Sequence, residues 1–525
     1  MGRPRISENL KLSNALTRLH NATGPDHGVI KGAALLQQDR ELLLKTGYLK
    51  EIIKGWYFIS APDAKDGDTT AFFANYWEYL SRYLDERFKD HYCLTAEQSL
   101  LLQAKHCVIP LQISLMTNQK ITQKIELYGD YSLFIYPTPR LIEPHLRDKI
   151  NGVQVMSSAA CLVSLGPKSY ESYSAEIQVL MNSIVNPYDL IQLVNLNSTG
   201  VARLIGAYKQ VGQADFAEKL ISSLKSASIS LPIVENPFNQ QPLIHFTHKR
   251  RPALASRIAM LWETNKETVL SYKPSGDTRM DMHPQDYGVN AEKIKLFDAY
   301  HSLSIERYRV TPELIAKIAQ GDWHNKTDAD HINAMAALGY LRAFEKVKDD
   351  CIKVYSGELT AAQLFRENHS EWFARLFSPS VDAGLLDRAD LLGFRRQTVI
   401  IKGSQHAPPH YDQVMDGMSS LIDCMSYESD PFVSAVLSHW LIGYIHPFID
   451  GNGRIARFTM NLMLAEGGYP WTVIEVNDRH RYMTALELAS VQNSITPFAD
   501  FISENIKSAA DKIRSSLSDD DRLSM

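Results

Sequence analysis

The sequence predicts a mainly α protein, in which a helical C-terminal part follows a winged helix and a mixed α/β domain. From Ala291 to about Ala510, apolar residues recur at helical spacing, and only Phe394 to Lys402 is rich in β-forming residues. Residues 12–60 combine short helical runs with a basic hairpin. The predicted parts are a winged helix over 1–70, an α/β domain over 71–235, a linker over 236–290, a helical domain over 291–510 and a flexible tail over 511–525.

Composition and charge are those of a soluble globular protein. The 525 residues are 45% hydrophobic and 22% charged, which gives enough apolar surface for several cores. The net charge of −5 excludes a polycation that coats nucleic acid. Residues 1–60 differ from the rest, with nine Lys and Arg against five Asp and Glu. DNA binding is therefore expected, if anywhere, in this N-terminal region.

The cysteines are odd in number, scattered and without a C-x-x-C pair: Cys93, Cys107, Cys161, Cys351 and Cys424. This pattern predicts buried thiols in a reducing cytosol, and neither a disulfide framework nor a zinc site. The N-terminus has no apolar core of signal-peptide length, and no stretch of about 18 apolar residues suggests a membrane span. We expect a cytoplasmic protein with no membrane partner.

The N-terminal module has a helical run at Leu12 to Leu19 and a strand-rich segment at 48–59, with a turn near Lys54-Gly55. It resembles the winged helix of the type IV abortive-infection antitoxins (AbiEi-like regulators). The shared positions are Leu44, Gly47, Leu49, Gly55, Trp56 and Tyr57. The resemblance implies DNA binding through residues 1–70; the alternative is a module that only packs against its neighbour.

Residues 71–235 contain predicted strands at 109–114, 124–127 and 132–136, and predicted helices at 179–184 and 201–217. The run from Ala202 to Tyr208 also resembles the second half of the AbiEi-like family. Residues 236–290 are rich in proline and poor in periodicity, so we expect a linker with one helix near Ala253 to Glu263.

Residues 446–457 are the most informative segment: His-Pro-Phe-Ile-Asp-Gly-Asn-Gly-Arg-Ile-Ala-Arg. An apolar helix from Pro431 to Tyr444 should end near His446, because the following proline disfavours helical geometry at that residue. A second helix should begin near Asn452 or Gly453 and end at Gly467-Gly468.

The chemistry of this loop suits a nucleoside triphosphate. Gly451-Asn452-Gly453 allows a nest of backbone amides at a helix N-terminus, which favours anions. Arg454 and Arg457 lie three residues apart and can hold phosphate oxygens, and Asp450 can meet a Mg²⁺ ion. His446 can act as a base near neutral pH. Each feature alone is usually structural, and only their combination at this spacing points to a site.

The segment resembles the motif of the Fic family, His-x-Phe-x-(Asp/Glu)-Gly-Asn-Gly-Arg-x-x-Arg, and the resemblance extends over about residues 290–505. It implies an all-helical core with a β-hairpin flap that transfers AMP from ATP to a hydroxyl group of a protein. His446 would be the base and Asp450 the Mg²⁺ ligand. Asn452 and the amides of Gly451 and Gly453 would meet the α-phosphate, while Arg454 and Arg457 would hold the β- and γ-phosphates. Asn452 and Gly453 argue against the branch of the family that acts as a protein kinase.

Two further segments match the family. The segment from Gly393 to Pro409 resembles its flap, which implies that Thr398, Val399, Ile400 and Ile401 align the target protein by strand addition. Ser302-Leu303-Ser304-Ile305-Glu306-Arg307 resembles its inhibitory motif, in which Glu306 would pair with Arg457 in place of the γ-phosphate. Arg307 departs from the family, which has Gly or Asn there. The alternative is an ordinary exposed helical glutamate, and in some relatives this glutamate positions a water that removes AMP.

Two hypotheses of different classes follow. The first is a protein adenylyltransferase that uses ATP and Mg²⁺ on an unidentified target protein and is inhibited by Glu306. A homodimer is a candidate assembly, because dimerisation often tunes the inhibitory glutamate in relatives. The second is a DNA-binding regulator of the toxin–antitoxin type, in which the Fic domain is a sensor or is secondary.

Overall fold

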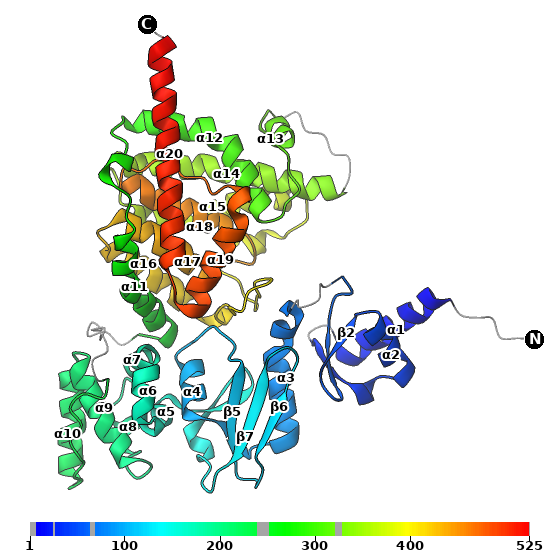
Figure 1. Cartoon of the computed structure of the whole chain (residues 1–525), viewed down its shortest axis with the longest axis vertical. Helices are drawn as coiled ribbons and strands as arrows, with labels where there is room; N and C mark the ends of the chain where they lie inside the picture. The colour runs from blue at the N-terminus through cyan, green and yellow to red at the C-terminus, as the bar shows by residue number, and fades with distance from the viewer. Residues whose placement is uncertain (1–6, 25–26, 64–68, 239–250, 321–327, 524–525) are drawn as a thin grey trace, which may run out of the picture. The chain divides into compact units, whose positions relative to one another are not determined.

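The computed structural model describes residues 7–24, 27–63, 69–238, 251–320 and 328–523, which form two compact units (Figure 1). Unit 1 comprises residues 1–253 and 400–407, and unit 2 comprises residues 254–399 and 408–525. The helix expected near Ala253 to Glu263, within the linker over 236–290, is present as α11 (Ala253–Ser271). It extends beyond the predicted end, and α12 (Pro284–Ile305) also begins before residue 290. Residues 239–250 of that linker lie outside the described residues.

The first part of unit 1 alternates helices with a small antiparallel sheet of strand order β1-β3-β2. The predicted hairpin is present, with its turn at Lys54-Gly55, where Gly55 has a φ of +87°. Apolar side chains that include Ala15, Leu19 and Leu43 form a core under the sheet. The elements are α1 (Glu8–Thr23), β1 (Val29–Lys31), η1 (Gly32–Ala34), α2 (Gln37–Lys45), β2 (Leu49–Ile53) and β3 (Trp56–Ile59).

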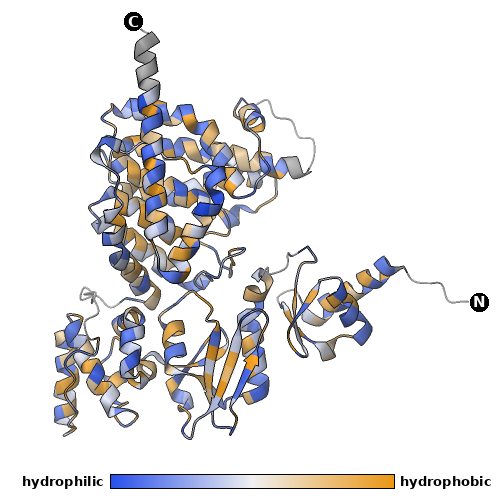
Figure 2. Ribbon diagram, viewed as in Figure 1, coloured by the Kyte–Doolittle hydropathy of each residue, from blue (hydrophilic) through white to orange (hydrophobic). Residues whose placement is uncertain are grey.

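A second sheet of unit 1 has the strand order β4-β5-β7-β6, in which β5 and β7 are parallel and the other pairs are antiparallel. Apolar residues stand out on its neighbouring strands in Figure 2. The strand predicted at 109–114 is shifted to β5, because Pro110 cannot donate to a ladder. The elements are α3 (Thr70–Phe88), β4 (Tyr92–Leu94), α4 (Ala96–Gln103), β5 (Gln112–Thr117), β6 (Gln123–Glu126), β7 (Ser132–Pro137), η2 (Pro144–Leu146), β8 (Arg147–Ile150) and β9 (Val153–Met156).

The rest of unit 1 is helical. The single helix predicted over 201–217 is two helices, because the chain turns at Gly212, whose φ is +78°. Residues 400–407 belong to this unit: the Gly403 N–H donates to Thr70 Oγ1, and His406 forms an isolated bridge with Val108. The helices are α5 (Ser158–Ser164), α6 (Pro167–Ser172), α7 (Ser174–Ser183), α8 (Tyr188–Ile191), α9 (Ser198–Gln210) and α10 (Ala214–Ser226).

The described residues of unit 2 form helices joined by loops, and none of them belongs to a strand. The tail expected to be flexible over 511–525 is helical as far as Leu523. Besides α11 and α12, the elements are η3 (Gly276–Thr278), α13 (Pro312–Ala319), α14 (Asp328–Tyr355), α15 (Ala361–Asp382), η4 (Arg388–Leu391), η5 (Tyr411–Gln413), α16 (Val414–Tyr427), α17 (Pro431–Ile445), α18 (Asn452–Glu466), η6 (Val476–Asp478), α19 (Arg479–Gln492) and α20 (Thr496–Leu523).

Two adjacent helices, α17 and α18, form the centre of unit 2 and pack against each other, and α18 also packs on α14 and α15. Almost every residue of α17 is buried, which is expected of a helix that is apolar on all sides. Asp430 starts α17 by accepting the N–H groups of Phe432 and Val433 at 3.0 and 3.2 Å. The short connection from α17 to α18 is the segment 446–451, so the core fixes both ends of that loop.

In the part of the chain that the structure describes, no helix is both long and apolar enough to cross a membrane.

Candidate active site

The loop between α17 and α18 begins with a left-handed residue. Helix α17 ends at Ile445, and His446 follows it with φ +52° and ψ +59°. Pro447 explains this end, since a proline disfavours helical geometry at the residue before it. Phe448 then stacks on Phe373 of α15, with ring centroids 4.3 Å apart. The corner that carries His446 is therefore fixed from both sides.

The imidazole of His446 is partly buried, and its Nδ1 lies 3.3 Å from the carbonyl oxygen of Gly443. A carbonyl can only accept, so Nδ1 carries the proton and Nε2 keeps its lone pair. Burial lowers the pKa of His446 to about 4, and the nearby positive charge of Arg395 acts in the same direction. His446 is therefore neutral at pH 7, as a general base must be.

The side chain of Asn452 closes the loop on itself. Its Oδ1 accepts the Phe448 N–H at 2.8 Å, and its Nδ2 donates to the Phe448 carbonyl at 2.8 Å. Asn452 is buried, so this amide holds the loop in shape. The family resemblance implied a contact with the α-phosphate; in this arrangement the Asn452 side chain is already engaged, and only its backbone N–H is available for that role.

Backbone amides gather at the start of α18. Gly451 has a φ of +76°, and the first helical hydrogen bond runs from the Ile455 N–H to the Gly451 carbonyl. The N–H groups of Asn452, Gly453 and Arg454 therefore precede the helical ladder and need partners from elsewhere. Such a helix N-terminus attracts anions.

Glu306 contacts both arginines of the motif. Its Oε1 lies 2.8 Å from Arg457 Nη2, and its Oε2 lies 2.8 Å from Arg454 Nε. Ser302 adds to this arrangement, because Arg457 Nε donates to Ser302 Oγ at 2.9 Å. Burial lowers the pKa of Arg457, but the charge and hydrogen bond of Glu306, together with the nearby Tyr482 and Tyr340, leave that pKa raised. The expected Glu306–Arg457 pair is present, and Glu306 makes a second contact, with Arg454, that the motif does not predict.

Arg454 is fully buried but incompletely bonded. Its guanidinium lies between two rings, 5.2 Å from the centroid of Tyr308 and 5.0 Å from that of Phe377. Within the described residues its Nη1 has no hydrogen-bond partner, and the contact of its Nε with Glu306 is an ion pair without hydrogen-bond geometry. An unsatisfied buried guanidinium is costly, so this one suits an additional anion such as a phosphate.

Asp450 stands at the mouth of the site, with a side chain that is 54% exposed. Its Oδ1 accepts the Gly451 N–H at 2.7 Å, and its Oδ2 lies 3.3 Å from both the Tyr308 hydroxyl and Arg454 Nη2. The described residues hold no cluster of three or more His, Cys, Asp or Glu for a metal. A single carboxylate cannot hold Mg²⁺ alone, so substrate phosphates and water would have to supply the other ligands of the ion.

Arg307 occupies the left-handed position after α12, with a φ of +69°. Glu306 is the C-cap of that helix, and the Arg307 N–H bonds back to the Ser304 carbonyl at 3.0 Å. This geometry explains why related proteins have Gly or Asn here, since those residues adopt it at low cost. The departure in this chain therefore leaves the helix end in place but strains one residue.

The predicted flap is not a hairpin in this structure. The strand expected over Phe394 to Lys402 is wrong, because none of these residues belongs to a strand. Thr398 and Val399 fall in unit 2, whereas Ile400 and Ile401 fall in unit 1. A strand needs a partner, and at the base of this segment the hydrogen bonds go instead to loop carbonyls, as from the Arg395 N–H to Pro447.

Sequence reasoning missed three contributors: Tyr308, Phe377 and Arg395. Each reaches the loop from a distant part of the chain, so no local pattern marks it. Only Tyr308 could have been suspected, since it lies two residues after Glu306.

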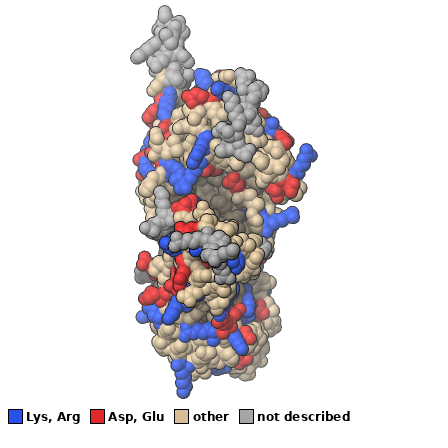
Figure 3. Space-filling model, turned by 90° about the vertical axis from the view of Figure 1, so that its right-hand side faces the viewer, with Lys and Arg blue, Asp and Glu red and all other residues tan. Residues whose placement is uncertain are grey.

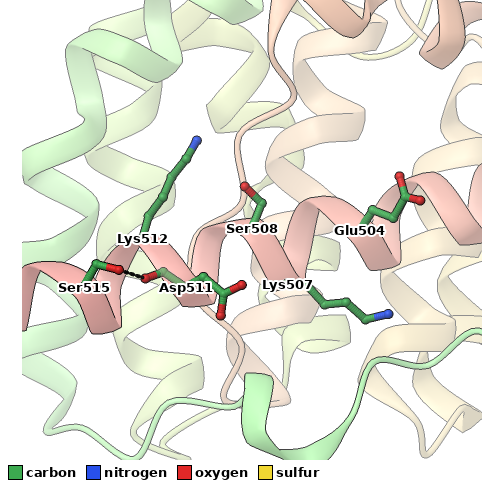
Figure 4. Close-up of a pocket in the computed structure, with 6 residues that line it drawn as sticks. All are labelled: Glu504, Lys507, Ser508, Asp511, Lys512 and Ser515. Carbon is green, nitrogen blue, oxygen red and sulfur yellow. Dashed lines mark hydrogen bonds between the residues drawn. The ribbon is translucent and has the colours of Figure 1, made fainter.

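A surface hollow of about 630 Å³ lies elsewhere, on α20. Figure 4 shows the six polar side chains that line it, with Ser515 Oγ donating to the Asp511 carbonyl at 2.9 Å. Exposed charges of both signs on one helix face do not form a catalytic arrangement, and none of these residues belongs to the 446–457 loop.

Comparison with known proteins matches the region of the sequence that contains this loop. Residues 359–464 match the sequence model of the Fic/DOC family, so the chain contains a Fic domain. The matched segment includes the whole 446–457 loop and excludes both Glu306 and the N-terminal module.

Individual relatives resemble the same region. The chain is 37% identical over 115 residues to the protein adenylyltransferase Fic of Drosophila willistoni. The aligned residues make up 21% of this chain and 22% of the relative. It is 38% identical over 103 residues to the protein adenylyltransferase Fic of Nematostella vectensis; the aligned residues make up 19% of this chain and 24% of the relative. The chain thus spans less than a quarter of these relatives. A solved structure of Fic-1 from C. elegans aligns with 69% of this chain and 99% of its own, at 15% identity and a TM-score of 0.37.

Proposed function

We propose that this protein is a protein adenylyltransferase that transfers AMP from ATP to a serine, threonine or tyrosine hydroxyl of another protein. One observation carries the proposal. A neutral His446 stands one short loop away from a helix N-terminus that holds two buried arginines. A base beside a phosphate-binding surface is what transfer of a nucleotidyl group to a weak nucleophile requires.

The chemistry balances with these groups. The acceptor hydroxyl loses its proton to His446 Nε2, and its oxygen forms a bond to the α-phosphorus of ATP. The bond between that phosphorus and the bridging oxygen breaks, and pyrophosphate leaves. The amides of Asn452 and Gly453 stabilise charge on the α-phosphoryl group, and Arg454 and Arg457 stabilise the pyrophosphate. Asp450 would hold Mg²⁺, which supplies further neutralisation of phosphate charge when bound.

Glu306 is proposed to inhibit this reaction. Its carboxylate occupies both guanidinium groups that the terminal phosphates need. Its approach also depends on Gly453, since a Cβ at that position would lie 2.7 Å from Glu306 Oε1. ATP must therefore displace Glu306 or bind in a pose that is unsuited to transfer.

The test uses full-length protein with labelled ATP and Mg²⁺. Glu306→Gly is expected to raise labelling of the protein itself or of lysate proteins, and His446→Ala in that background is expected to abolish it. Glu313→Gly, on the neighbouring helix α13, is the control and should leave labelling unchanged. Labelling that persists without His446 would rule out the mechanism. Mass spectrometry of the products identifies the transferred group, the target and any removal of AMP.

A second candidate function is DNA binding through residues 1–70. The order helix, strand, short helix, helix and hairpin, with the sheet order β1-β3-β2, supports a winged helix. On the face of the molecule in Figure 3, Lys and Arg are interspersed with Asp and Glu. DNA binding would therefore need a smaller region with an excess of positive charge. The excess of positive charge in residues 1–60 meets this requirement.

The test is a gel shift with the DNA upstream of the protein's own gene. Binding should weaken steeply as salt rises, because phosphate contacts release counterions. Lys54→Glu, in the hairpin turn, should weaken binding more than Lys209→Glu on α9. The absence of any shift at low salt would remove this candidate. The two functions are compatible in one chain.

A further inference from the structure

Arg395 contacts the chain at the end of α17, residues 445–447, through several hydrogen bonds. It is 5% exposed. Its Nε donates to the carbonyl of His446 at 2.7 Å, and its backbone N–H donates to the carbonyl of Pro447 at 2.9 Å. Its Nη2 also lies 3.5 Å from the carbonyl of Ile445. One buried guanidinium thus reaches the carbonyls of the residue before the base and of the base itself.

The same side chain fixes the segment that precedes and follows the predicted flap. Arg395 Nη1 donates to the Gln397 carbonyl at 2.9 Å, and Nη2 donates to the Pro409 carbonyl. The planar fork of a guanidinium directs its N–H groups in set directions, which a lysine cannot reproduce. Residues 395–397, 409 and 445–447 are therefore fixed relative to one another by one group.

These contacts stabilise residues 445–447 in two ways. The last carbonyls of a helix have no partners within it, and a positive charge at a helix C-terminus is favourable. His446 also has a left-handed φ of +52°, which residues with a side chain rarely adopt. That conformation sets the direction of the imidazole, so the groups that hold the His446 carbonyl also orient the base.

We propose that Arg395 is a positioning residue for the transfer reaction: its guanidinium holds the backbone of His446 in the left-handed conformation that aims Nε2 at the acceptor hydroxyl. The proposal rests on the proposed function and deepens it. Arg395 itself touches neither substrate nor the reacting atoms. Its positive charge additionally favours the neutral form of the imidazole.

The experiment compares Arg395→Lys and Arg395→Gln in the full-length Glu306→Gly background. Arg396→Gln is the matched control, since Arg396 is the exposed neighbour of the same charge. Three quantities are measured: the self-labelling rate at saturating ATP, the dissociation constant of ATP·Mg²⁺ by calorimetry, and the pKa of His446 by NMR titration. Thermal denaturation reports whether each variant is folded.

Both Arg395 variants are expected to lower the labelling rate about 100-fold, because a small misplacement of a catalytic group has effects of that size. The affinity for ATP·Mg²⁺ should stay unchanged. Arg395→Gln should raise the pKa of His446 from about 4, whereas Arg395→Lys should not. If Arg395→Gln does not fold, Arg395→Lys decides alone. A rate equal to that of the Arg396→Gln control, or a parallel loss of rate, affinity and thermal stability, would overturn the proposal.

The same experiment distinguishes a failure of the proposed adenylyltransferase function from a failure of the positioning role of Arg395. A Glu306→Gly parent that binds ATP·Mg²⁺ but never labels protein removes the adenylyltransferase. In that case the His446 titration still reports on Arg395: an unchanged pKa and unchanged ring resonances in Arg395→Gln would overturn its positioning role, and a raised pKa with shifted resonances would support it.

Discussion

Gly453 and Glu306 are so close that the glycine has no room for a side chain: a Cβ on Gly453 would lie 2.7 Å from Glu306 Oε1 and 3.1 Å from Arg457 Nη1. The missing side chain thus serves two purposes. It leaves the amides of the helix start uncovered by a side chain, and it admits the carboxylate that pairs with Arg454 and Arg457.

This closeness predicts non-additive effects on stability. Gly453→Ala should lower the free energy of unfolding in the wild type, because the methyl group meets a carboxylate held by two buried arginines. In the Glu306→Gly background the same change should cost about 1 kcal/mol less, as is usual for residues in contact. Chemical denaturation of the four proteins of this cycle measures the coupling. Additive values would show that Glu306 does not lie against Gly453 in solution.

Neutralising Glu306 without changing its shape should leave two buried positive charges. Glu306→Gln is expected to lower the free energy of unfolding by about 3 kcal/mol, since one partner of a buried ion pair is lost. Pyrophosphate should then raise the melting temperature of Glu306→Gln more than that of the wild type, because it can replace the missing anion. An equal rise in both proteins would contradict competition between Glu306 and phosphate.

Tyr308 should limit access of Mg²⁺ to Asp450. Its hydroxyl donates to Asp450 Oδ2 at 3.3 Å, while its ring stacks on Arg454. Tyr308→Phe keeps the ring and removes the hydrogen bond, so in the Glu306→Gly background the Mg²⁺ concentration for half-maximal labelling should fall about threefold. Tyr427→Phe, at an exposed position, is the control. A higher Mg²⁺ requirement in Tyr308→Phe would instead show that the hydroxyl contributes to metal binding.

Arg307→Gly should strengthen the inhibited state. The φ of +69° at Arg307 is unfavourable for a residue with a Cβ and acceptable for glycine. The change should raise the free energy of unfolding by about 1 kcal/mol and lower basal labelling. Arg309→Gly, two residues on and without a left-handed backbone, should give no such gain. Higher basal labelling in Arg307→Gly would mean that the arginine itself contributes to inhibition.

The pH dependence should report two buried imidazoles. Burial lowers the pKa of His446 to about 4 and that of His439 to about 3, both below their unfolded value near 6.5. The unfolded chain therefore binds more protons between these values, so stability should fall as the pH falls below about 6.5. Labelling by folded Glu306→Gly protein should persist to about pH 5, since His446 stays neutral. A loss of activity centred at pH 6.5 would show that the base is exposed.

Local sequence was sufficient to predict the loop but not its surroundings. Pro447 and the glycines at 451 and 453 determine where one helix ends and the next begins, so the positions of His446 and both arginines could be predicted. Arg395 and Tyr308 act on this loop from 51 and 142 residues away, through packing that no periodicity encodes. The segment 394–402 has the composition of a strand, but composition cannot supply the partner that a strand needs.

The position of Glu306 at the very end of α12 determines how its ion pairs with Arg454 and Arg457 can be released. Leu303 and Ile305 in this last turn are buried, so opening it costs more than the fraying of an exposed helix end but less than global unfolding. Releasing Glu306 therefore requires fraying of a single turn, while the remainder of α12 stays packed in the core. The resting activity of such an enzyme would be set by an equilibrium of local melting, so a ligand, a partner or one substitution near residue 307 could adjust it in small steps.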